Sequence, residues 1–437
     1  MTNTSETKLS YAWYVVFLLT LANISSFLDR QILALLVQPI KRDFHLSDTK
    51  ISLLMGLSFG IFYTIFGMFI GRMADRYSRR NIIMGGVIIW SFMTALCAGI
   101  RNYSQFFLAR IGVGVGEATL SPSAYSMIAD YFPKSKLGIA MSVFSLGIFL
   151  GSGIALLIGA GLVANLPQSG MVHLPIFGDI FPWQMLFIYI GLPGFVIALL
   201  LLTVKEPTRK GLLIKSDNST KLSLNESLVI IFKNKAAFLS ISFGTAFFAF
   251  VNYGLNAWVP TMIARTFEWK PQEAGLLYGS VIVISSVLGV LWGGWYADKL
   301  VKNGVSDGRL RVSVIGGICI LASSLIPLIT NPYLLLISLA FPGFFIAANI
   351  GSAGAAVQAI MPNQVRSLAS AIFLFILNMI GLGLGPTVVA LFTDYIFQDE
   401  KAIKNSLVLL ILIGGVATTS LFWYGLKPYQ KAIGEEA

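Results

Sequence analysis

The clearest indication of the fold is the stretch Gly71-Arg72-Met73-Ala74-Asp75-Arg76-Tyr77-Ser78-Arg79-Arg80, which ends a long apolar run. The later half of the chain repeats its order of small, acidic and basic residues as Gly294-Trp295-Tyr296-Ala297-Asp298-Lys299. A second landmark, Pro133-x6-Ala140, returns in the same way as Pro362-x6-Ala369. Because two landmarks recur in the same order, the sequence predicts two related halves.

Apolar runs occupy most of the chain around these two stretches. Hydrophobic residues make up 56% of the 437 residues and charged residues only 12%, whereas a soluble domain carries roughly 25% charged residues. So few charges cannot cover a soluble fold of this size, and we expect the bilayer to surround most of the chain. The runs predict an all-α membrane protein with twelve transmembrane helices, over residues 11–37, 51–74, 81–100, 104–131, 136–163, 183–204, 236–264, 272–298, 310–329, 332–360, 366–393 and 404–426.

The polar segments between the spans predict the domain organisation. The longest, 205–235, separates an N-terminal six-helix bundle over 1–204 from a C-terminal six-helix bundle over 236–437. Its later part, Leu222–Lys235, has the composition of a short amphipathic helix at a membrane surface. The segment 164–182 contains three prolines and predicts an external loop.

The basic residues predict the orientation of the chain. Most of the 31 Lys and Arg residues lie in the gaps that share a side with the two termini, so both termini should be cytoplasmic. The net charge of +11 is spread over short gaps and forms no continuous basic face, which argues against nucleic acid as a partner. The apolar run after the polar residues 1–10 is too long for a signal peptide, and we interpret it as a retained first span.

Catalytic and metal-binding patterns are not found in the sequence. His45 and His173 fall in predicted external loops, and Cys97 and Cys319 stand singly inside apolar runs, so no metal site is expected. No phosphate-binding P-loop sequence occurs, which disfavours an ATP-driven pump. We therefore expect a protein that is not an enzyme and needs no cofactor.

The stretch 71–80 closely resembles the signature of the major facilitator superfamily, G-x-L-A-D-R-x-G-R-[RK], with Met73 for Leu and Ser78 for the second Gly. We expect Gly71 to allow close approach of a neighbouring helix, and Asp75 to face a helix N-terminus or an Arg. The alternative is a basic loop without a gating role. The resemblance implies a latch on the cytoplasmic side, formed by Gly71, Asp75, Arg76, Arg79, Arg80, Gly294 and Asp298.

Ionisable residues within the spans are the strongest functional signal. Asp29 and Arg30 fall in the first predicted span, and Arg110 and Glu117 fall in the fourth. Each such side chain costs about 2.5–3.5 kcal/mol at the centre of a membrane helix, so it needs a partner or a watery cavity. Arg110 and Glu117 are two helical turns apart, about 10 Å along one face. The four charges either form two structural ion pairs or include a carboxylate that loads and releases a proton.

The second half has no equivalent charges. Neutral polar residues take their place in its spans, where they avoid lipid. They are candidates for a cavity lining, although hydrogen bonds between helices account for them equally well. These candidates are Asn252, Tyr253, Asn256, Asn349, Gln358 and Asn378. Charge in one half and neutral surface in the other would suit a substrate with a charged head and an apolar body.

Within the superfamily, the first half looks most like the Spinster family. The resemblance rests on Asp29-Arg30, Arg110, Gly114-x-Gly116-Glu117-Ala118 and Ser126-Met127-Ile128-Ala129-Asp130-Tyr131-Phe132. It implies a proton-linked carrier with Asp29 and Glu117 at the proton-coupling positions and Arg30 and Arg110 beside them as substrate or charge partners. Eukaryotic members of that family move lysophospholipids and sphingoid lipids.

The sequence thus predicts a secondary transporter that works by alternating access. Its coupling ion would be the proton, and its substrate an amphiphilic lipid or lysolipid. The first alternative is a carrier of small organic anions such as sugar acids, with Arg30 and Arg110 gripping the carboxylate. A more distant alternative is a membrane receptor that binds its ligand without moving it. We expect a monomer in a bacterial inner membrane.

Overall fold

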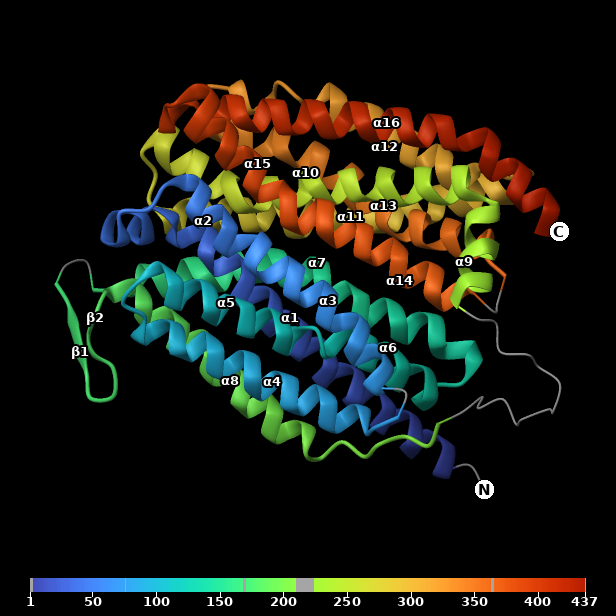
Figure 1. Ribbon diagram of the computed structural model, residues 1–437, viewed down its shortest axis with the longest axis horizontal. Helices are drawn as coiled ribbons and strands as arrows, with labels where there is room; N and C mark the ends of the chain where they lie inside the picture. The colour runs from blue at the N-terminus through green and yellow to red at the C-terminus, as the bar shows by residue number, and fades with distance from the viewer. Residues whose placement is uncertain (1–2, 75, 168–169, 210–223, 363–364, 437) are drawn as a thin grey trace. The chain divides into compact units, whose positions relative to one another are not determined.

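The structure, a computed structural model, describes residues 3–74, 76–167, 170–209, 224–362 and 365–436. Its contacts divide the chain into two compact units, which are described separately (Figure 1). Unit 1 comprises Met1–Leu212 and Trp269–Ser280, and unit 2 comprises Leu213–Glu268 and Val281–Ala437. The first part of α11 (Pro271–Lys302) therefore packs with the N-terminal half of the chain.

Unit 1 is built from long helices and one small hairpin. Its helices are α1 (Asn3–Phe44), α2 (Asp48–Met55), α3 (Leu57–Ala74), α4 (Arg79–Leu96), α5 (Tyr103–Glu117), α6 (Leu120–Tyr131), α7 (Lys134–Ala164) and α8 (Met185–Leu201), with short 3₁₀ turns η1 (Cys97–Gly99) and η2 (Pro182–Gln184). Polar caps begin several of them: the Ser78 hydroxyl accepts a bond from the Asn81 N–H at α4, and the Asn102 side chain accepts one from the Gln105 N–H at α5.

The predicted loop 164–182 contains a two-stranded antiparallel sheet. Strand β1 (Val172–Leu174) pairs with β2 (Gly178–Ile180), so that His173 lies opposite Asp179. Gly178 adopts a positive φ of 69°, which glycine reaches without steric cost. This hairpin is the part of the chain that apolar periodicity missed, because its strands are too short to carry a pattern.

Unit 2 contains the remaining helices. They are α9 (Leu224–Lys233), α10 (Lys235–Phe267), the later part of α11, α12 (Gly308–Ala322), η3 (Ile326–Leu328), α13 (Pro332–Ala359), α14 (Arg366–Leu377), the π-helical segments η4 (Asn378–Leu384) and η5 (Phe392–Phe397) on either side of α15 (Gly385–Leu391), η6 (Glu400–Ala402) and α16 (Ile403–Glu436). The helix predicted over Leu222–Lys235 corresponds to α9, although residues 222 and 223 lie outside the described residues. Its placement at a membrane surface stays a prediction.

Ten helical segments in the described part of the chain are long and apolar enough to cross a membrane. The two other predicted spans coincide with α7 and with the pair α5 and α6. The fourth span breaks between α5 and α6 because Pro122 has no N–H to donate to the carbonyl of Ala118, four residues earlier. The twelve predicted spans are thus all helical.

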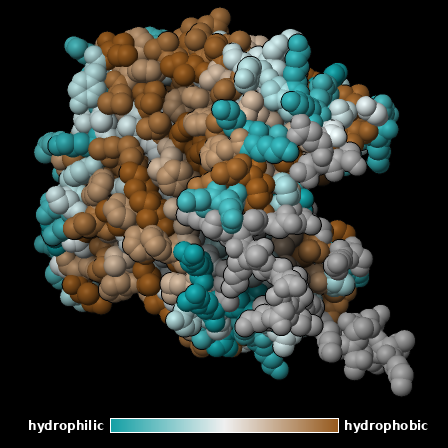
Figure 2. All heavy atoms as spheres, turned by 45° about the vertical axis from the view of Figure 1, so that its right-hand side comes forward, coloured by the Kyte–Doolittle hydropathy of each residue, from teal (hydrophilic) through white to brown (hydrophobic). Residues whose placement is uncertain are grey.

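The surface of these helices suits a bilayer. On the face shown in Figure 2, hydrophobic side chains cover most of the middle of the surface, and hydrophilic side chains gather toward its edges. Large apolar side chains such as Phe69, Leu199, Leu291 and Trp423 are each more than half exposed. In water such a surface would aggregate, whereas lipid tails solvate it without cost.

Candidate functional site

Asp29 and Arg110 form a buried ion pair between α1 and α5 in unit 1. Arg110 Nη1 donates to Asp29 Oδ1 at 3.0 Å, and the Thr94 hydroxyl on α4 donates to the other carboxylate oxygen. Asp29, Arg110 and Thr94 are at most 1% exposed. Nε and Nη2 of Arg110 have no hydrogen-bond partner among the described residues. The pair is therefore charge-balanced but incompletely hydrogen-bonded.

Arg30 and Glu117 form a second ion pair between the same helices. Arg30 Nη2 lies 2.5 Å from Glu117 Oε2, and Arg30 Nε donates to the same oxygen at 2.7 Å. The Ser26 hydroxyl, one turn before Arg30, also donates to Oε2 at 2.5 Å. Glu117 Oε1 is buried and has no partner among the described residues. One oxygen of this carboxylate is thus fully occupied, and the other is open to a proton or a water molecule.

Glycines bring the helices of this site together. A Cβ on Gly114 would lie 2.9 Å from the backbone oxygen of Phe59 on α3, and a Cβ on Gly116 would lie 2.7 Å from the backbone nitrogen of Trp90 on α4. Only glycine permits both approaches, so the Gly114-x-Gly116 sequence allows α5 to pack closely against α3 and α4. This packing places Glu117 beside α1.

The four charges within the spans thus form two ion pairs in the structure, and whether one carboxylate also binds a proton stays a prediction. The sequence interpretation missed Ser26 and Thr94, the hydroxyl groups that orient the two carboxylates. A signal for Ser26 was present, because it precedes Arg30 by four residues and so shares its helix face. Thr94 had no such signal, since only packing of α4 against α1 brings it to Asp29.

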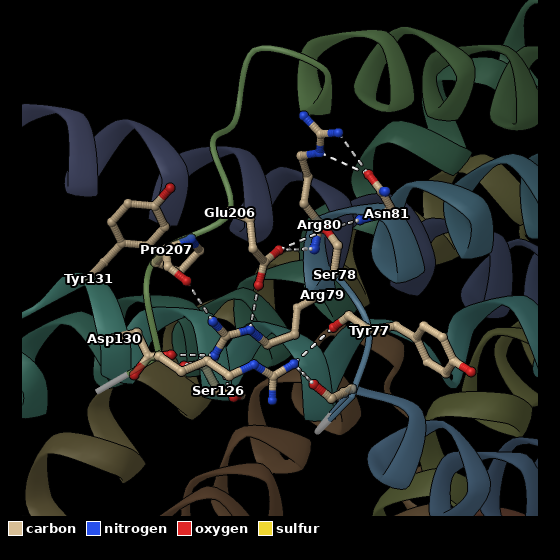
Figure 3. Close-up of polar contacts among 12 residues, drawn as sticks. Tyr77, Ser78, Arg79, Arg80, Asn81, Ser126, Asp130, Tyr131, Glu206 and Pro207 are labelled. Carbon is tan, nitrogen blue, oxygen red and sulfur yellow. Dashed lines mark hydrogen bonds and ion pairs between the residues drawn. The ribbon is translucent and has the colours of Figure 1, made fainter. Parts of the chain in front are cut away.

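Arg79 is the centre of a second polar cluster in unit 1 (Figure 3). It is 1% exposed and forms an ion pair with Asp130 at the end of α6. Arg79 Nε donates to Glu206 Oε1 at 2.8 Å, and Arg79 Nη1 donates to the Ser126 hydroxyl at 2.8 Å. A buried guanidinium needs partners for all its N–H groups, and this one finds them on two segments, α6 and the stretch after α8.

Glu206 ties the segment after α8 to the start of α4. Its Oε2 accepts hydrogen bonds from the Ser78 hydroxyl at 3.0 Å and from the Arg80 backbone N–H at 2.9 Å (Figure 3). Partial burial by itself raises the pKa of Glu206, but the donors on Arg80, Arg79 and Ser78 together hold the pKa below its ordinary value. The ionised carboxylate is therefore the form that the cluster binds.

The segment Thr203–Arg209, here called the strap, also contacts three other helices of unit 1. The Tyr11 hydroxyl on α1 donates to the Thr203 carbonyl at 2.9 Å, and the Tyr131 hydroxyl at the end of α6 donates to the Lys205 carbonyl. Arg209 Nη2 donates to the carbonyl of Ala74, the last residue of α3, and to that of Tyr77, which follows α3. Residues 205–209 of the strap were predicted as the start of a linker, and the structure shows that they are hydrogen-bonded to the helices of unit 1.

Other residues of the predicted gate motif make fewer contacts. Asp75 lies outside the described residues, and Arg76 and Asp298 are exposed. No described atom lies within 4 Å of a Cβ placed on Gly71 or Gly294, so the close helix approach expected at Gly71 stays a prediction. Arg80 donates through Nη1 to the Val204 carbonyl at 3.2 Å.

Unit 2 has a related cluster of opposite charge. Asp307, directly before α12, is 1% exposed and accepts hydrogen bonds from Arg311 Nε at 2.9 Å and from Gln430 Nε2 at 2.8 Å. Asp307 lies just before the third span of its half, as Arg79 lies at the start of the third span of unit 1, and Gln430 lies near the C-terminal end of α16. An anion thus stands in unit 2 where unit 1 has a cation.

The neutral polar candidates of unit 2 mostly bond to nearby side chains. Asn349 on α13 accepts from the Ser313 hydroxyl on α12 at 2.5 Å, while Asn256 Nδ2 donates to Asn252 Oδ1 along α10 at 3.2 Å. Gln358 Nε2 donates to the Ser370 hydroxyl at 3.3 Å. Tyr253 is half-buried on α10, and Asn378 is half-buried at the start of η4. Their contact with a substrate stays a prediction.

The sequence matches the profile of the Major Facilitator Superfamily over residues 19–386 and again over 241–435. The chain belongs to this superfamily. Major facilitator proteins are transporters and not enzymes, so the chain is a multi-pass membrane transporter with the twelve-helix fold. The second match begins inside the first, and the relation between the two halves stays a prediction.

Full-length relatives refine this assignment. A major-facilitator-type efflux pump of Mycolicibacterium smegmatis is 29% identical, over 98% of this chain and 95% of its own length. Spinster homolog 1 of Xenopus laevis is 27% identical, over 93% of this chain and 80% of its own length. A protein named as a probable galactarate/D-glucarate transporter of Bacillus subtilis is 24% identical, over 94% of this chain and 93% of its own length.

Among solved structures, the chain is similar to a bacterial homologue of the human lysosomal transporter Spinster, in an inward-facing and unoccupied conformation. The TM-score is 0.73 at 26% sequence identity, and the match covers 97% of both chains. The Spinster resemblance that rested on the residues of spans one and four is therefore confirmed along the whole chain.

Proposed function

We propose that this major facilitator protein is a proton-coupled secondary transporter of an amphiphilic lipid or lysolipid, which works by alternating access. The observation that carries the proposal is the arrangement of Glu117, whose Oε2 receives every hydrogen bond while its buried Oε1 has no described partner. A membrane helix retains such a carboxylate at a cost of about 2.5–3.5 kcal/mol, which a proton-binding role would explain.

Glu117 Oε1 is the atom proposed to take the proton. Protonation there leaves the bonds at Oε2 geometrically possible but removes the charge that holds Arg30. Arg30 can then pair with a substrate anion instead, so that proton binding and substrate binding are linked. Asp29 is the second proton-coupling candidate, and Arg110 is its charge partner.

The substrate class is proposed from the charge distribution and the relatives. The buried charges of unit 1 suit the charged head of an amphiphile, and the neutral polar residues that take their place in unit 2 suit its apolar body. The Spinster-named relative and the Spinster homologue of known structure support this assignment. The neutral candidates Asn252, Asn256 and Asn349 would then contribute hydrogen bonds to the substrate.

A second candidate substrate is a small organic anion such as a sugar acid. One relative is named as a probable galactarate/D-glucarate transporter, and Arg30 and Arg110 could bind a carboxylate with paired N–H groups. In this version Arg30 would leave Glu117 for the substrate carboxylate. The proposed setting is the same for both: a monomer in a bacterial inner membrane, with both termini cytoplasmic and no cofactor other than the coupling proton.

Proton flux in proteoliposomes with an enclosed pH dye tests the proposal. One preparation is challenged with a lysophospholipid and with D-glucarate, with protein-free liposomes as the control for leakage caused by the lysolipid. Flux with the lysolipid alone supports the lipid carrier, and flux with D-glucarate alone moves the protein to the sugar-acid class. Binding of either compound without any flux of proton or substrate would identify a receptor and refute the transporter.

A further inference from the structure

Phe59 on α3 contacts both arginines of the buried ion pairs. Its ring centroid lies 4.3 Å from the Arg30 guanidinium carbon and 5.8 Å from that of Arg110. The side chain is completely buried. Tyr63, one turn later, stacks on Phe59 at 5.3 Å and 21°, and its ring lies 4.9 Å from the Arg30 guanidinium carbon. Two cations thus share one aromatic side chain that no sequence motif singled out.

Backbone packing fixes the place of this ring. The backbone oxygen of Phe59 lies 2.9 Å from where a Cβ on Gly114 would stand, so α3 and α5 are in close contact at this level. Arg110 precedes Gly114 by one turn on α5, and Arg30 comes from α1. The ring therefore has little freedom to move away from the two guanidinium groups.

The ring supplies attraction that the carboxylates do not. Arg110 leaves Nε and Nη2 without hydrogen-bond partners among the described residues, and the face of an aromatic ring attracts a cation electrostatically. Arg30 has a full anion at Glu117 only while that carboxylate is ionised. Unlike the carboxylates, the face of Phe59 keeps its charge distribution at every pH.

We propose that Phe59 is a positioning residue for proton coupling: its ring holds Arg30 and Arg110 in place when Glu117 becomes neutral. This inference rests on the proposed function of Glu117. The support of Phe59 makes the neutral state of Glu117 less costly, because Arg30 then keeps one favourable contact after it loses its anion. Tyr63 adds to this support for Arg30, and Phe27, whose ring lies 5.0 Å from the Arg30 guanidinium carbon, does the same.

Removal of the Phe59 ring should shift the pH dependence of transport in one defined direction. The charged and titratable groups of the cluster are Asp29 and Arg30 on α1, Tyr63 on α3, Cys97 after α4, and Arg110 and Glu117 on α5. Without the ring, Arg30 depends more strongly on ionised Glu117, and a higher proton concentration is needed to neutralise it. The pH of half-maximal proton-coupled flux should then move toward acid.

The test compares pH profiles of flux in proteoliposomes for three variants. Phe59→Leu keeps an apolar side chain without a ring and should shift the midpoint by about one pH unit toward acid, equivalent to about 1.4 kcal/mol. Phe59→Tyr keeps the aromatic face and should have the same midpoint as the unmodified protein. Phe106→Leu is the matched control, because Phe106 is also fully buried and packs on Phe187 and Trp183, and among the described residues its ring makes no cation–π contact with Arg30 or Arg110.

The outcomes separate the inference from the proposed function. An acid shift in Phe59→Leu that is absent from Phe59→Tyr and Phe106→Leu supports it. An unchanged midpoint in Phe59→Leu, or equal shifts in both leucine variants, overturns the inference about Phe59. The proposed function still stands in that case, provided that the unmodified protein shows pH-dependent flux. If Phe59→Leu fails to fold, Tyr63→Leu replaces it, with a smaller acid shift expected and an unchanged midpoint counting against the inference. Absence of proton-coupled flux in the unmodified protein refutes both.

Discussion

Arg30 and Glu117 meet between α1 and α5 in an ion pair that uses only one oxygen of the carboxylate. Both guanidinium contacts and the Ser26 hydroxyl reach Oε2, while Oε1 has no partner in the described part of the chain. A purely structural ion pair gains most when both oxygens are hydrogen-bonded, as in a bidentate Arg–carboxylate contact. The open oxygen therefore favours a carboxylate that changes its protonation state.

Replacing Glu117 by Gln should abolish proton-coupled flux. The amide oxygen can still accept bonds from Ser26 and Arg30, so the helices stay packed, but the side chain no longer binds a proton. We expect downhill substrate exchange to persist while uphill transport driven by a pH gradient is lost. Glu226→Gln, on exposed α9, is the control and should retain both activities. Full uphill transport in Glu117→Gln would remove Glu117 from the coupling site.

The Asp29–Arg110 pair should show strong coupling in a double-mutant cycle. Asp29→Asn leaves the fully buried Arg110 without its anion, which costs about 3–5 kcal/mol of stability. Arg110→Gln leaves Asp29 unpaired at a similar cost. The double variant has no net buried charge, so its destabilisation should be smaller than the sum of the two. Thermal unfolding in detergent measures the cycle, and additive losses would show that the pair does not interact.

Gly114→Ala should destabilise unit 1 far more than an alanine elsewhere in its helices. The added Cβ would lie 2.9 Å from the backbone oxygen of Phe59, which can move only with α3. Gly67→Ala on α3 is the matched control, because no described atom lies within 4 Å of its added Cβ. That control should gain up to about 1 kcal/mol of helix stability. Equal unfolding temperatures for the two variants would refute the close contact between α3 and α5.

The strap should be released by acid. The pKa of Glu206 is lowered in the folded chain, so the stability that its ionised form contributes is present at neutral pH and is lost as the pH falls through that lowered pKa. Glu206→Gln should lower the unfolding temperature at pH 7 and lose this part of the acid dependence. Unfolding scans between pH 3 and pH 7 measure both effects. An identical pH dependence in the variant would show that the Glu206 contacts with Arg79 and Arg80 add no stability.

The membrane spans and the charged residues within them could be predicted from the sequence alone. Helix length and apolar composition are local properties that the thickness of the bilayer imposes on each segment, so the twelve spans could be predicted one at a time. The cost of burying charge also acts on each residue separately, and it singled out Asp29, Arg30, Arg110 and Glu117 before any packing was known. The repeated stretch at 71–80 and 294–299 added the two related halves.

The pairing of these groups depends on how the helices pack in three dimensions. Asp29 and Arg30 are neighbours in the sequence, yet each pairs with a residue more than 80 positions away on α5. Thr94, Phe59 and Glu206 gave no sequence signal, because their roles depend on α3, α4 and the strap lying against α1 and α5. Such partners are chosen by the packing of several helices at once, which no periodicity within a single segment records.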